Sequence, residues 1–360
     1  MMNPPPHSVL IVDDSAFMRK LIVEMVAEHP DFNVIGIARD GLDAMKQLHR
    51  LAPDIVTLDL EMPRLDGLDV LQRIMAESPR PVVVLSAGGP QYGDATLRAL
   101  ELGAVDFVRK PSGPVSLDLP IIRDRLIAAL EAAARANVSA PSAKSERTLP
   151  AKAAVPSTAP RAAQHVVVIA SSTGGPRALA DIVPRLPETL PAAVVIAQHL
   201  PGEFTPALAA RLARESRIMV YEAHDGMLLS EGCVYIARGG MNTTIAGAPG
   251  NAILCEQPPS PCVSPTPNAD VLFGSAARIF GAGCTGVVLT GMGRDGAAGL
   301  REIRAVGGRA IVQDEASSAI YGMPRAALSE AGADHVASLS MMAEEIIGIV
   351  PKERLEWLTA

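Results

Sequence analysis

The sequence has few aromatic residues and no excess of positive charge. Phenylalanine, tryptophan and tyrosine make up only 3% of the 360 residues, so we expect an aliphatic core. The formal net charge is -7 at pH 7. Because nucleic-acid binding needs a basic surface, this charge argues against nucleic acid as the main partner. Hydrophobic residues make up 48% of the chain, which argues against disorder.

Long apolar runs and a secretion signal are also missing from the sequence. No run approaches the roughly 18 apolar residues that a membrane-spanning helix needs, so we expect no membrane insertion. No N-terminal stretch combines basic residues with an apolar segment. Four cysteines are present without C-x-x-C pairing, and we expect them to be free thiols: Cys233, Cys255, Cys262 and Cys284. These features predict a cytoplasmic protein.

Residues 8–130 alternate short Val/Ile/Leu-rich runs with amphipathic stretches. Helical patterns include Ala16–Glu28 and Leu68–Glu77. The expected strands are Val9–Val12, Val34–Ile37, Ile55–Leu58, Val82–Leu85 and Val105–Val108. Five βα units in about 125 residues predict an α/β domain with a doubly wound parallel sheet.

The pattern changes over residues 136–164, which are rich in Ala, Pro, Ser and Lys. Four prolines interrupt any helix there: Pro141, Pro150, Pro156 and Pro160. This composition predicts an extended linker between two domains.

A second α/β region covers residues 165–350. The expected helices are Glu203–Arg214 and Ala297–Ala305. The expected strands are His165–Ala170, Ala193–Ala197, Val234–Ala237, Val287–Thr290 and Ala310–Gln313. This alternation predicts a second doubly wound parallel sheet.

Three carboxylates and one ammonium group end strands of the first region. Asp13 and Asp14 follow the first expected strand, Asp59 follows the third, and Lys110 follows the fifth. The carboxyl ends of parallel strands converge on one crevice, so we expect these groups to meet. Clustered carboxylates suit Mg²⁺, and a carboxylate beside that ion can act as a nucleophile toward phosphorus.

In the second region, Ser172, His199 and Asp295 each follow an expected strand. Each has an ordinary structural alternative. The Ser-Thr-Gly-Gly turn can bind phosphate, the histidine can be structural, and the aspartate can be a helix N-cap. Their common placement favours a shared crevice holding nucleophile, base and orienting carboxylate.

The first region resembles the receiver domain of bacterial response regulators. The motifs are Asp13-Asp14-Ser15, Asp59-Leu-Glu-Met-Pro63, Asp66-Gly67, Ser86-Ala87 and Lys110-Pro111. The resemblance implies a flavodoxin-like (βα)5 fold in which a histidine kinase provides the phosphoryl group for Asp59. It further implies Mg²⁺ on Asp13, Asp14, Asp59 and the Glu61 carbonyl, with Lys110, Ser86 and the aromatic Phe107 as switch residues.

The second region is similar to the catalytic domain of chemotaxis protein-glutamate methylesterases, the CheB family. The similarity rests on Ala170-Ser-Ser-Thr-Gly-Gly-Pro176, Ala197-Gln-His-Leu-Pro201, Leu289–Gly299 and Tyr321-Gly-Met-Pro-Arg325. It implies a phosphorylation-activated esterase and glutamine deamidase that acts on methyl-accepting chemotaxis receptors. The unphosphorylated receiver is expected to cover the cleft, and the protein is expected to associate with chemoreceptor arrays.

The same resemblance implies roles for individual residues. Ser172 is the expected nucleophile, His199 the general base and Asp295 its orienting partner. The backbone N–H groups of Thr173 and Met292 are the expected oxyanion donors. No cofactor is expected in this domain.

Three segments depart from the family pattern. Arg294 stands where the family often has asparagine, and both Ala237–Asn242 and Pro265–Asp270 differ from the usual runs. The changes at 238–242 and at Arg294 motivate a rival hypothesis, a non-enzymatic, phosphorylation-dependent docking protein with a degenerate esterase domain. The complete triad argues against this hypothesis.

Overall fold

The computed structural model describes residues 5–87, 93–111, 119–138, 161–260 and 265–350. The chain divides into two compact units, Met1–Arg147 and Thr148–Ala360. Most of the predicted linker, and Cys262, lie outside the described residues. The domain boundaries expected at residues 130 and 165 therefore stay predictions.

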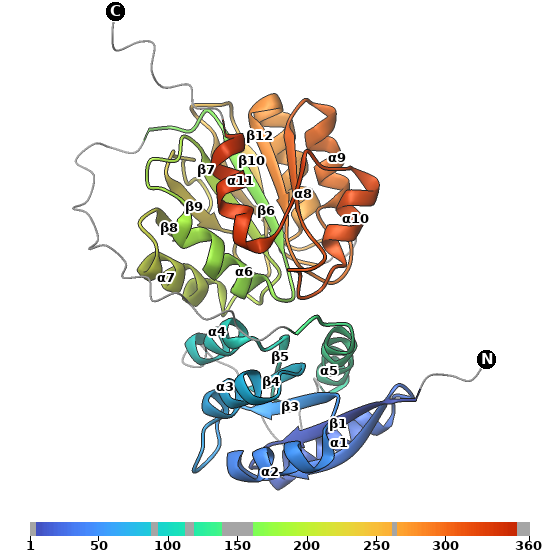
Figure 1. The fold of residues 1–360 in the computed structure, drawn as a ribbon. Helices are drawn as coiled ribbons and strands as arrows, with labels where there is room; N and C mark the ends of the chain where they lie inside the picture. The colour runs from blue at the N-terminus through green and yellow to red at the C-terminus, as the bar shows by residue number, and fades with distance from the viewer. Residues whose placement is uncertain (1–4, 88–92, 112–118, 139–160, 261–264, 351–360) are drawn as a thin grey trace, which may run out of the picture. The chain divides into compact units, whose positions relative to one another are not determined.

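The first unit contains a five-stranded parallel sheet with the order β2-β1-β3-β4-β5 (Figure 1). Its strands are β1 (His7–Val12), β2 (Phe32–Ala38), β3 (Ile55–Asp59), β4 (Val82–Ser86) and β5 (Asp106–Arg109). Its helices are α1 (Ala16–Ala27), α2 (Gly41–Leu51), α3 (Gly67–Glu77), α4 (Gly93–Leu102) and α5 (Leu119–Ala134).

Local sequence accounts for these elements. The central strands are continuous buried apolar runs, as expected for a parallel sheet with both faces covered. Side chains of Ser15, Asp40 and Asp66 accept hydrogen bonds from the first turns of α1, α2 and α3. The chain reverses its direction across the sheet between β1 and β3, so their carboxyl ends flank a crevice.

The second unit contains a seven-stranded parallel sheet with the order β14-β13-β12-β6-β7-β9-β8. The strands are β6 (Val166–Ser171), β7 (Ala193–Gln198), β8 (Met219–Glu222), β9 (Cys233–Ile236), β12 (Cys284–Val288), β13 (Arg309–Gln313) and β14 (His335–Ala337). Beside it, β10 (Asn242–Ala246) and β11 (Ile253–Gln257) form an antiparallel pair.

The described part of this unit contains six α-helices: α6 (Gly175–Ile182), α7 (Thr205–Glu215), α8 (Ala269–Phe280), α9 (Ala297–Ala305), α10 (Met323–Glu330) and α11 (Met342–Ile349). Three short 3-10 helices are η2 (Val183–Arg185), η3 (Gly281–Gly283) and η4 (Leu339–Met341). The sheet order reverses between β6 and β12, so their carboxyl ends flank the second crevice.

The structure confirms the α/β fold class and corrects several expected bounds. The strand expected at Val287–Thr290 lies at Cys284–Val288, because Thr285 and Gly286 continue the pairing with β6 and β13. Val105 precedes β5 rather than belonging to it. Four strands and several helices, among them α8, α10 and α11, were not predicted from the sequence. The strands, β8, β10, β11 and β14, are short or lie outside the sheet centre.

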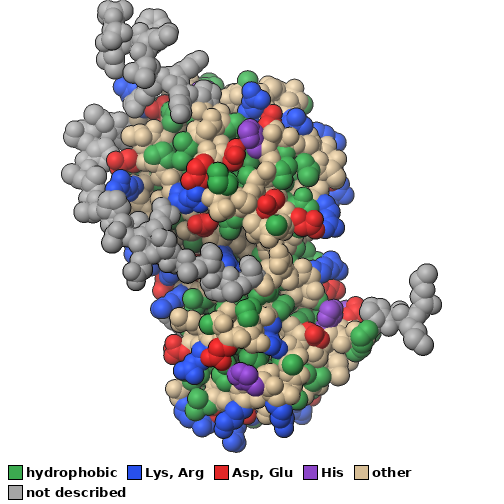
Figure 2. All heavy atoms as spheres, viewed as in Figure 1, with side chains coloured by type: hydrophobic (Ala, Val, Ile, Leu, Met, Phe, Trp, Pro, Cys, Tyr) green, Lys and Arg blue, Asp and Glu red, His purple; other side chains and the backbone are tan. Residues whose placement is uncertain are grey.

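Surface composition agrees with the charge of the sequence. On the face that Figure 2 shows, acidic and basic side chains are interspersed in both units. None of the helices in the described ranges combines the length and apolar character needed to cross a bilayer.

Helices α8 and α9 approach closely at Gly299, where a Cβ would lie 2.5 Å from the Phe273 Cβ and 3.0 Å from the Asp270 Cα. Gly299→Ala should therefore destabilise the second unit by about 1–3 kcal/mol through overpacking, despite the higher helix propensity of alanine. Gly348 in α11 has no atom within 4 Å of such a Cβ. Gly348→Ala should instead stabilise by about 0.5–1 kcal/mol. Urea unfolding measures both effects, and equal shifts would contradict the proposed contact.

Candidate active site and acidic cluster

The three polar residues expected at strand ends of the second unit lie at one edge of its sheet. Ser172 follows β6, His199 follows β7, and Asp295 lies in the turn between β12 and α9. The Ser172 N–H donates to the Thr290 carbonyl, and the His199 N–H donates to the Ser171 carbonyl, each at 3.0 Å. Because β6 lies between β12 and β7, the sheet holds these three segments side by side.

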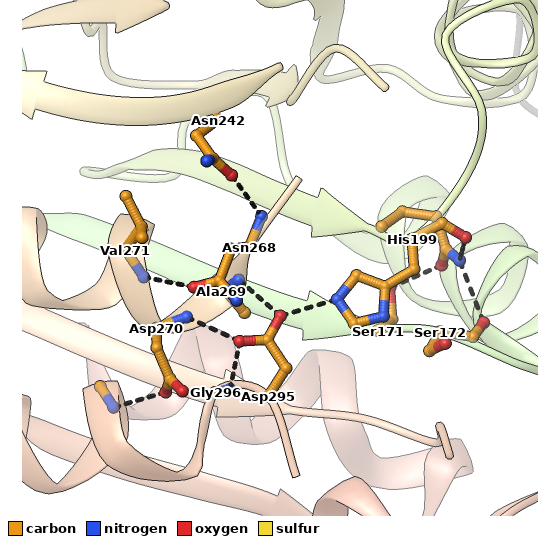
Figure 3. Close-up of polar contacts among 12 residues, drawn as sticks. Ser171, Ser172, His199, Asn242, Asn268, Ala269, Asp270, Val271, Asp295 and Gly296 are labelled. Carbon is orange, nitrogen blue, oxygen red and sulfur yellow. Dashed lines mark hydrogen bonds and ion pairs between the residues drawn. The ribbon is translucent and has the colours of Figure 1, made fainter. Parts of the chain in front are cut away.

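His199 and Asp295 are joined by a side-chain hydrogen bond. The imidazole Nε2 lies 2.7 Å from Asp295 Oδ2, and both side chains are largely buried. Figure 3 shows Asp295 and Ser172 on opposite sides of the imidazole. A proton on Nε2 that points at the carboxylate leaves the lone pair on Nδ1, which is the atom free to accept a proton.

The Ser172 side chain is half-buried, and its hydroxyl makes no hydrogen bond to His199 in the part of the chain that the structure describes. Hydrogen bonds between catalytic groups are often long without substrate and tighten in the Michaelis complex. The geometry therefore brings the imidazole and the carboxylate together and leaves the hydroxyl open to a substrate.

The Asp295 carboxylate accepts three backbone hydrogen bonds in addition to its contact with His199. Oδ2 accepts from Ala269 N–H at 2.7 Å, and Oδ1 accepts from Asp270 and Gly296 N–H at 3.0 and 3.1 Å. The first two donors start helix α8, whose dipole favours a negative charge there. Gly296, rather than Asp295, is the N-cap of α9. The alternative role of Asp295 as the cap of its own helix is therefore wrong.

Two asparagines that sequence reasoning did not single out as site residues support this arrangement. The Asn268 side chain caps α8 by accepting from Val271 N–H at 2.9 Å, and Asn242 Oδ1 accepts from Asn268 N–H at 2.9 Å. Both residues lie in segments that depart from the family pattern. An N-cap residue before Ala269 is a local signal that could have located α8. Arg294, the third departure, pairs at 2.7 Å with Glu330 of α10.

Two backbone amides lie near Ser172, that of Thr173 in the turn after β6 and that of Met292 in the segment after β12. Gly174 has a φ of 78°, a left-handed conformation that favours glycine. Neither the Thr173 nor the Met292 N–H donates to any described residue. A Cβ on Gly291 would lie 2.7 Å from Ser172 Cβ, so the segment carrying Met292 passes directly against the serine. Two free N–H donors beside a hydroxyl suit a developing oxyanion.

In the first unit, the acidic residues and Lys110 meet as expected. Lys110 Nζ lies 2.8 Å from Asp13 Oδ2 and 2.6 Å from Asp59 Oδ2. Ligand oxygens of Asp13, Asp14 and Asp59 all lie within 4.8 Å of one another. Asp13 and Asp59 are buried, whereas Asp14 is exposed. Burial, together with the Asp13 charge, raises the pKa of Asp59 to about 6, although Lys110 opposes the shift.

These residues fit a hard divalent cation such as Mg²⁺. The buried Oδ2 atoms of Asp13 and Asp59 share a single cation, the Lys110 ammonium. Oxygen ligands of this kind, open on the Asp14 side, match the few-carboxylate sites that Mg²⁺ uses. Glu61 lies beside them, and its N–H donates to Asp59 Oδ1 at 3.1 Å.

The two other expected switch residues lie on β4 and β5, the strands that follow β3 in the sheet order. Ser86 Oγ is 2.7 Å from Thr96 Oγ1 of α4, and the Phe107 ring is buried in the unit. Backbone pairing still links Ser86 to the cluster, because the Lys110 N–H donates to the Ser86 carbonyl at 2.9 Å.

Comparisons with known proteins divide the chain in the same order. A family profile described as CheB methylesterase matches residues 167–346, and a response regulator receiver domain profile matches residues 9–121. The catalytic domain of the Thermotoga maritima CheB methylesterase is 36% identical, with a TM-score of 0.50. The match covers 52% of this chain and 98% of that domain.

Several relatives match nearly the whole chain. A protein-glutamate methylesterase/protein-glutamine glutaminase from Geobacillus kaustophilus is 43% identical over 95% of this chain and 98% of the relative. Proteins of the same description from Pyrococcus horikoshii and Bacillus subtilis are 41% and 39% identical, covering 95% and 96% of this chain and 93% and 99% of the relatives.

The acidic cluster predicts a pH-dependent effect of Mg²⁺ on stability. Because the pKa of Asp59 is raised to about 6, its carboxyl keeps its proton in the folded protein at about pH 5 and loses it by about pH 7.5. Excess Mg²⁺ should therefore raise the melting temperature of the first unit more at the higher pH. Calorimetry with and without EDTA measures this shift. Asp54→Asn, at the other end of β3, should preserve the effect, whereas an equal shift at both pH values would contradict it.

Proposed function

Because this chain belongs to the CheB methylesterase family and carries a response regulator receiver domain, we propose that it is a serine hydrolase acting in chemotactic adaptation. Its substrates are glutamate γ-methyl esters, and the corresponding glutamine amides, on methyl-accepting chemotaxis receptors. The observation that carries the proposal is the 2.7 Å bond between His199 and Asp295, with Ser172 across the ring.

The proposed reaction is acyl transfer in two steps. Ser172 Oγ attacks the ester carbonyl while His199 takes its proton, and Asp295 stabilises the resulting imidazolium. The Thr173 and Met292 N–H groups hold the oxyanion, and each such donor is worth roughly 3–4 kcal/mol in the transition state. His199 returns the proton to the departing methoxide, so methanol leaves. Water activated by His199 then cleaves the Ser172 ester, releasing glutamate. With a glutamine substrate, ammonia leaves instead.

In this proposal, the first unit regulates the esterase activity of the second. Asp59 accepts a phosphoryl group from a chemotaxis histidine kinase, with Asp13, Asp14, Asp59 and the Glu61 carbonyl as the ligands of Mg²⁺. The bound cation would neutralise charge between the carboxylates and the incoming phosphoryl group. Phosphorylation adds about 1.5–2 negative charges and strong acceptor oxygens.

The added charge provides the driving force of the switch. Lys110 pairs with the phosphoryl group, and Ser86 leaves Thr96 to donate to it. Phe107 repacks with that movement. The receiver comprises residues 8–130 and the esterase domain residues 165–350, joined by the linker 136–164. A cytoplasmic location at receptor arrays follows from the proposed substrate.

The rival docking hypothesis loses its motivation at two positions. Arg294 turns to Glu330, and Asn242 supports Asn268 at the start of α8. Neither contact obstructs the His199–Asp295 pair, so these departures are compatible with turnover.

Ser172→Ala should lower methanol release from methylated receptor membranes by at least about 10⁴-fold, because the nucleophile is lost. Receiver phosphorylation should persist, because Asp59 lies in the other unit, and urea unfolding controls for the folding of the second unit. Ser171→Ala should lower the activity far less, by about 3- to 10-fold, because that hydroxyl is buried and bonded to Gln198 rather than open to substrate. Normal turnover by Ser172→Ala would exclude Ser172 as the nucleophile.

Asp59→Asn should leave basal esterase activity in place and abolish its stimulation by acetyl phosphate, because the amide cannot form an acyl phosphate. Methanol release with and without the phosphodonor measures the response. Asp54→Asn should respond like the natural protein. Normal stimulation of Asp59→Asn would show that phosphorylation occurs elsewhere.

A further inference from the structure

A buried carboxamide contacts the backbone of both Ser172 and His199. Gln198 is the last residue of β7, pairs in register with Ser171 at the end of β6, and is only 1% exposed. Its Nε2 lies 3.0 Å from the carbonyl oxygen of Ser172 and 3.3 Å from the carbonyl oxygen of His199, the next residue in the chain. The segments that supply nucleophile and base therefore converge on one NH₂ group.

The chemistry of the partners fixes the orientation of this carboxamide. Backbone carbonyls only accept hydrogen bonds, so the NH₂ end of Gln198 must face Ser172 and His199. The opposite end, Oε1, accepts from the Ser171 hydroxyl at 2.7 Å. Both ends of the carboxamide are therefore hydrogen-bonded, the NH₂ group as donor and Oε1 as acceptor. A carboxylate of the same shape has no donor and could satisfy only the Ser171 contact.

The turn after β6 is shaped around this side chain. A Cβ on Gly175 would lie 2.0 Å from Gln198 Oε1 and 2.9 Å from Ser171 Cβ, so only glycine leaves room for the carboxamide. The Ser172 carbonyl also accepts from the Gly175 N–H at 2.8 Å. The backbone that carries the serine is thus fixed from two sides, by its own turn and by β7.

We propose that Gln198 is a positioning residue that sets Ser172 relative to His199, acting through their carbonyl groups rather than on the substrate. This inference rests on the proposed serine hydrolase function. Catalysis by a nucleophile and a base depends on their separation, and a displacement of about 1 Å can cost 10²-fold in rate. Pairing of β6 with β7 aligns the two backbones as far as Ser171 and Gln198. Beyond these residues, Gln198 restricts the remaining backbone motion of Ser172 and His199.

The test compares Gln198→Glu with the natural protein. The substitution keeps the size of the side chain, removes both donors and places oxygen against two carbonyls. We expect kcat for methanol release to fall by about 10²-fold, with KM changed by less than about threefold because Gln198 does not touch substrate. Labelling of Ser172 by a small fluorophosphonate should slow in parallel. A purely structural role would lower the apparent kcat only in proportion to the folded fraction, so rates are expressed per folded protein, measured by urea unfolding, and an unchanged kcat per folded protein would contradict the proposal.

Two further variants keep the inference testable if Gln198→Glu fails to fold. Ser171→Ala removes the anchor of Oε1 and should slow labelling by about 3- to 10-fold. Ser275→Ala is the matched control, since that hydroxyl is likewise buried and hydrogen-bonded but lies within α8, where it donates to the Leu272 carbonyl and accepts from the Ile245 N–H. It should label at the natural rate.

The outcomes separate the two hypotheses. No labelling of Ser172 in the natural protein would overturn the proposed function. Labelling of the natural protein together with an equal rate in folded Gln198→Glu would overturn the role of Gln198 alone. If only the serine variants fold, equal rates for Ser171→Ala and Ser275→Ala would overturn it as well.

Discussion

The second unit depends on keeping one buried carboxylate hydrogen-bonded. Asp295 is 7% exposed, and a buried charge is costly unless donors surround it. Its donors come from the start of α8, from its own turn and from the residue after β7. Satisfying this one group therefore fixes the relative positions of three segments that are distant in the sequence. The same requirement orients the imidazole, so the stability of the fold and the geometry of the site have a common physical cause.

The segments that depart from the family pattern take part in this arrangement. Asn242 starts β10 and Asn268 precedes α8, and their hydrogen bond places the helix whose amides hold Asp295. The substituted residues therefore support the helix that holds Asp295 and do not themselves bond to the three reacting groups. Comparison with the family pattern shows only that these residues differ. The hydrogen bonds show that the residues present here still support the N-terminus of α8.

Sequence reasoning succeeded where a strand ends in a polar residue. Buried strands are continuous apolar runs, so the residues that follow β6 and β7 could be identified from the sequence. The reversal of sheet order follows from the alternation of strands and helices. The hydrogen-bond partner of each polar side chain could not be predicted from the sequence. Nothing in the local sequence tells that Asp295 bonds to α8 rather than capping α9, that Gln198 reaches back to Ser172, or that Ser86 bonds to Thr96. Such contacts depend on tertiary packing between distant segments.

Two aspartates, Asp59 at the end of β3 and Asp295 in the turn after β12, illustrate how the environment of a carboxylate determines its chemistry. Asp295 accepts from several backbone amides and the imidazole, which suits a fixed negative charge that orients a base. Asp59 shares one ammonium with Asp13 in a buried site, and this burial raises its pKa to about 6. Its charge is only partly compensated, so a cation or a covalent phosphoryl group can change the balance. The donors around a carboxylate, more than its place at a strand end, thus separate an orienting group from a switch.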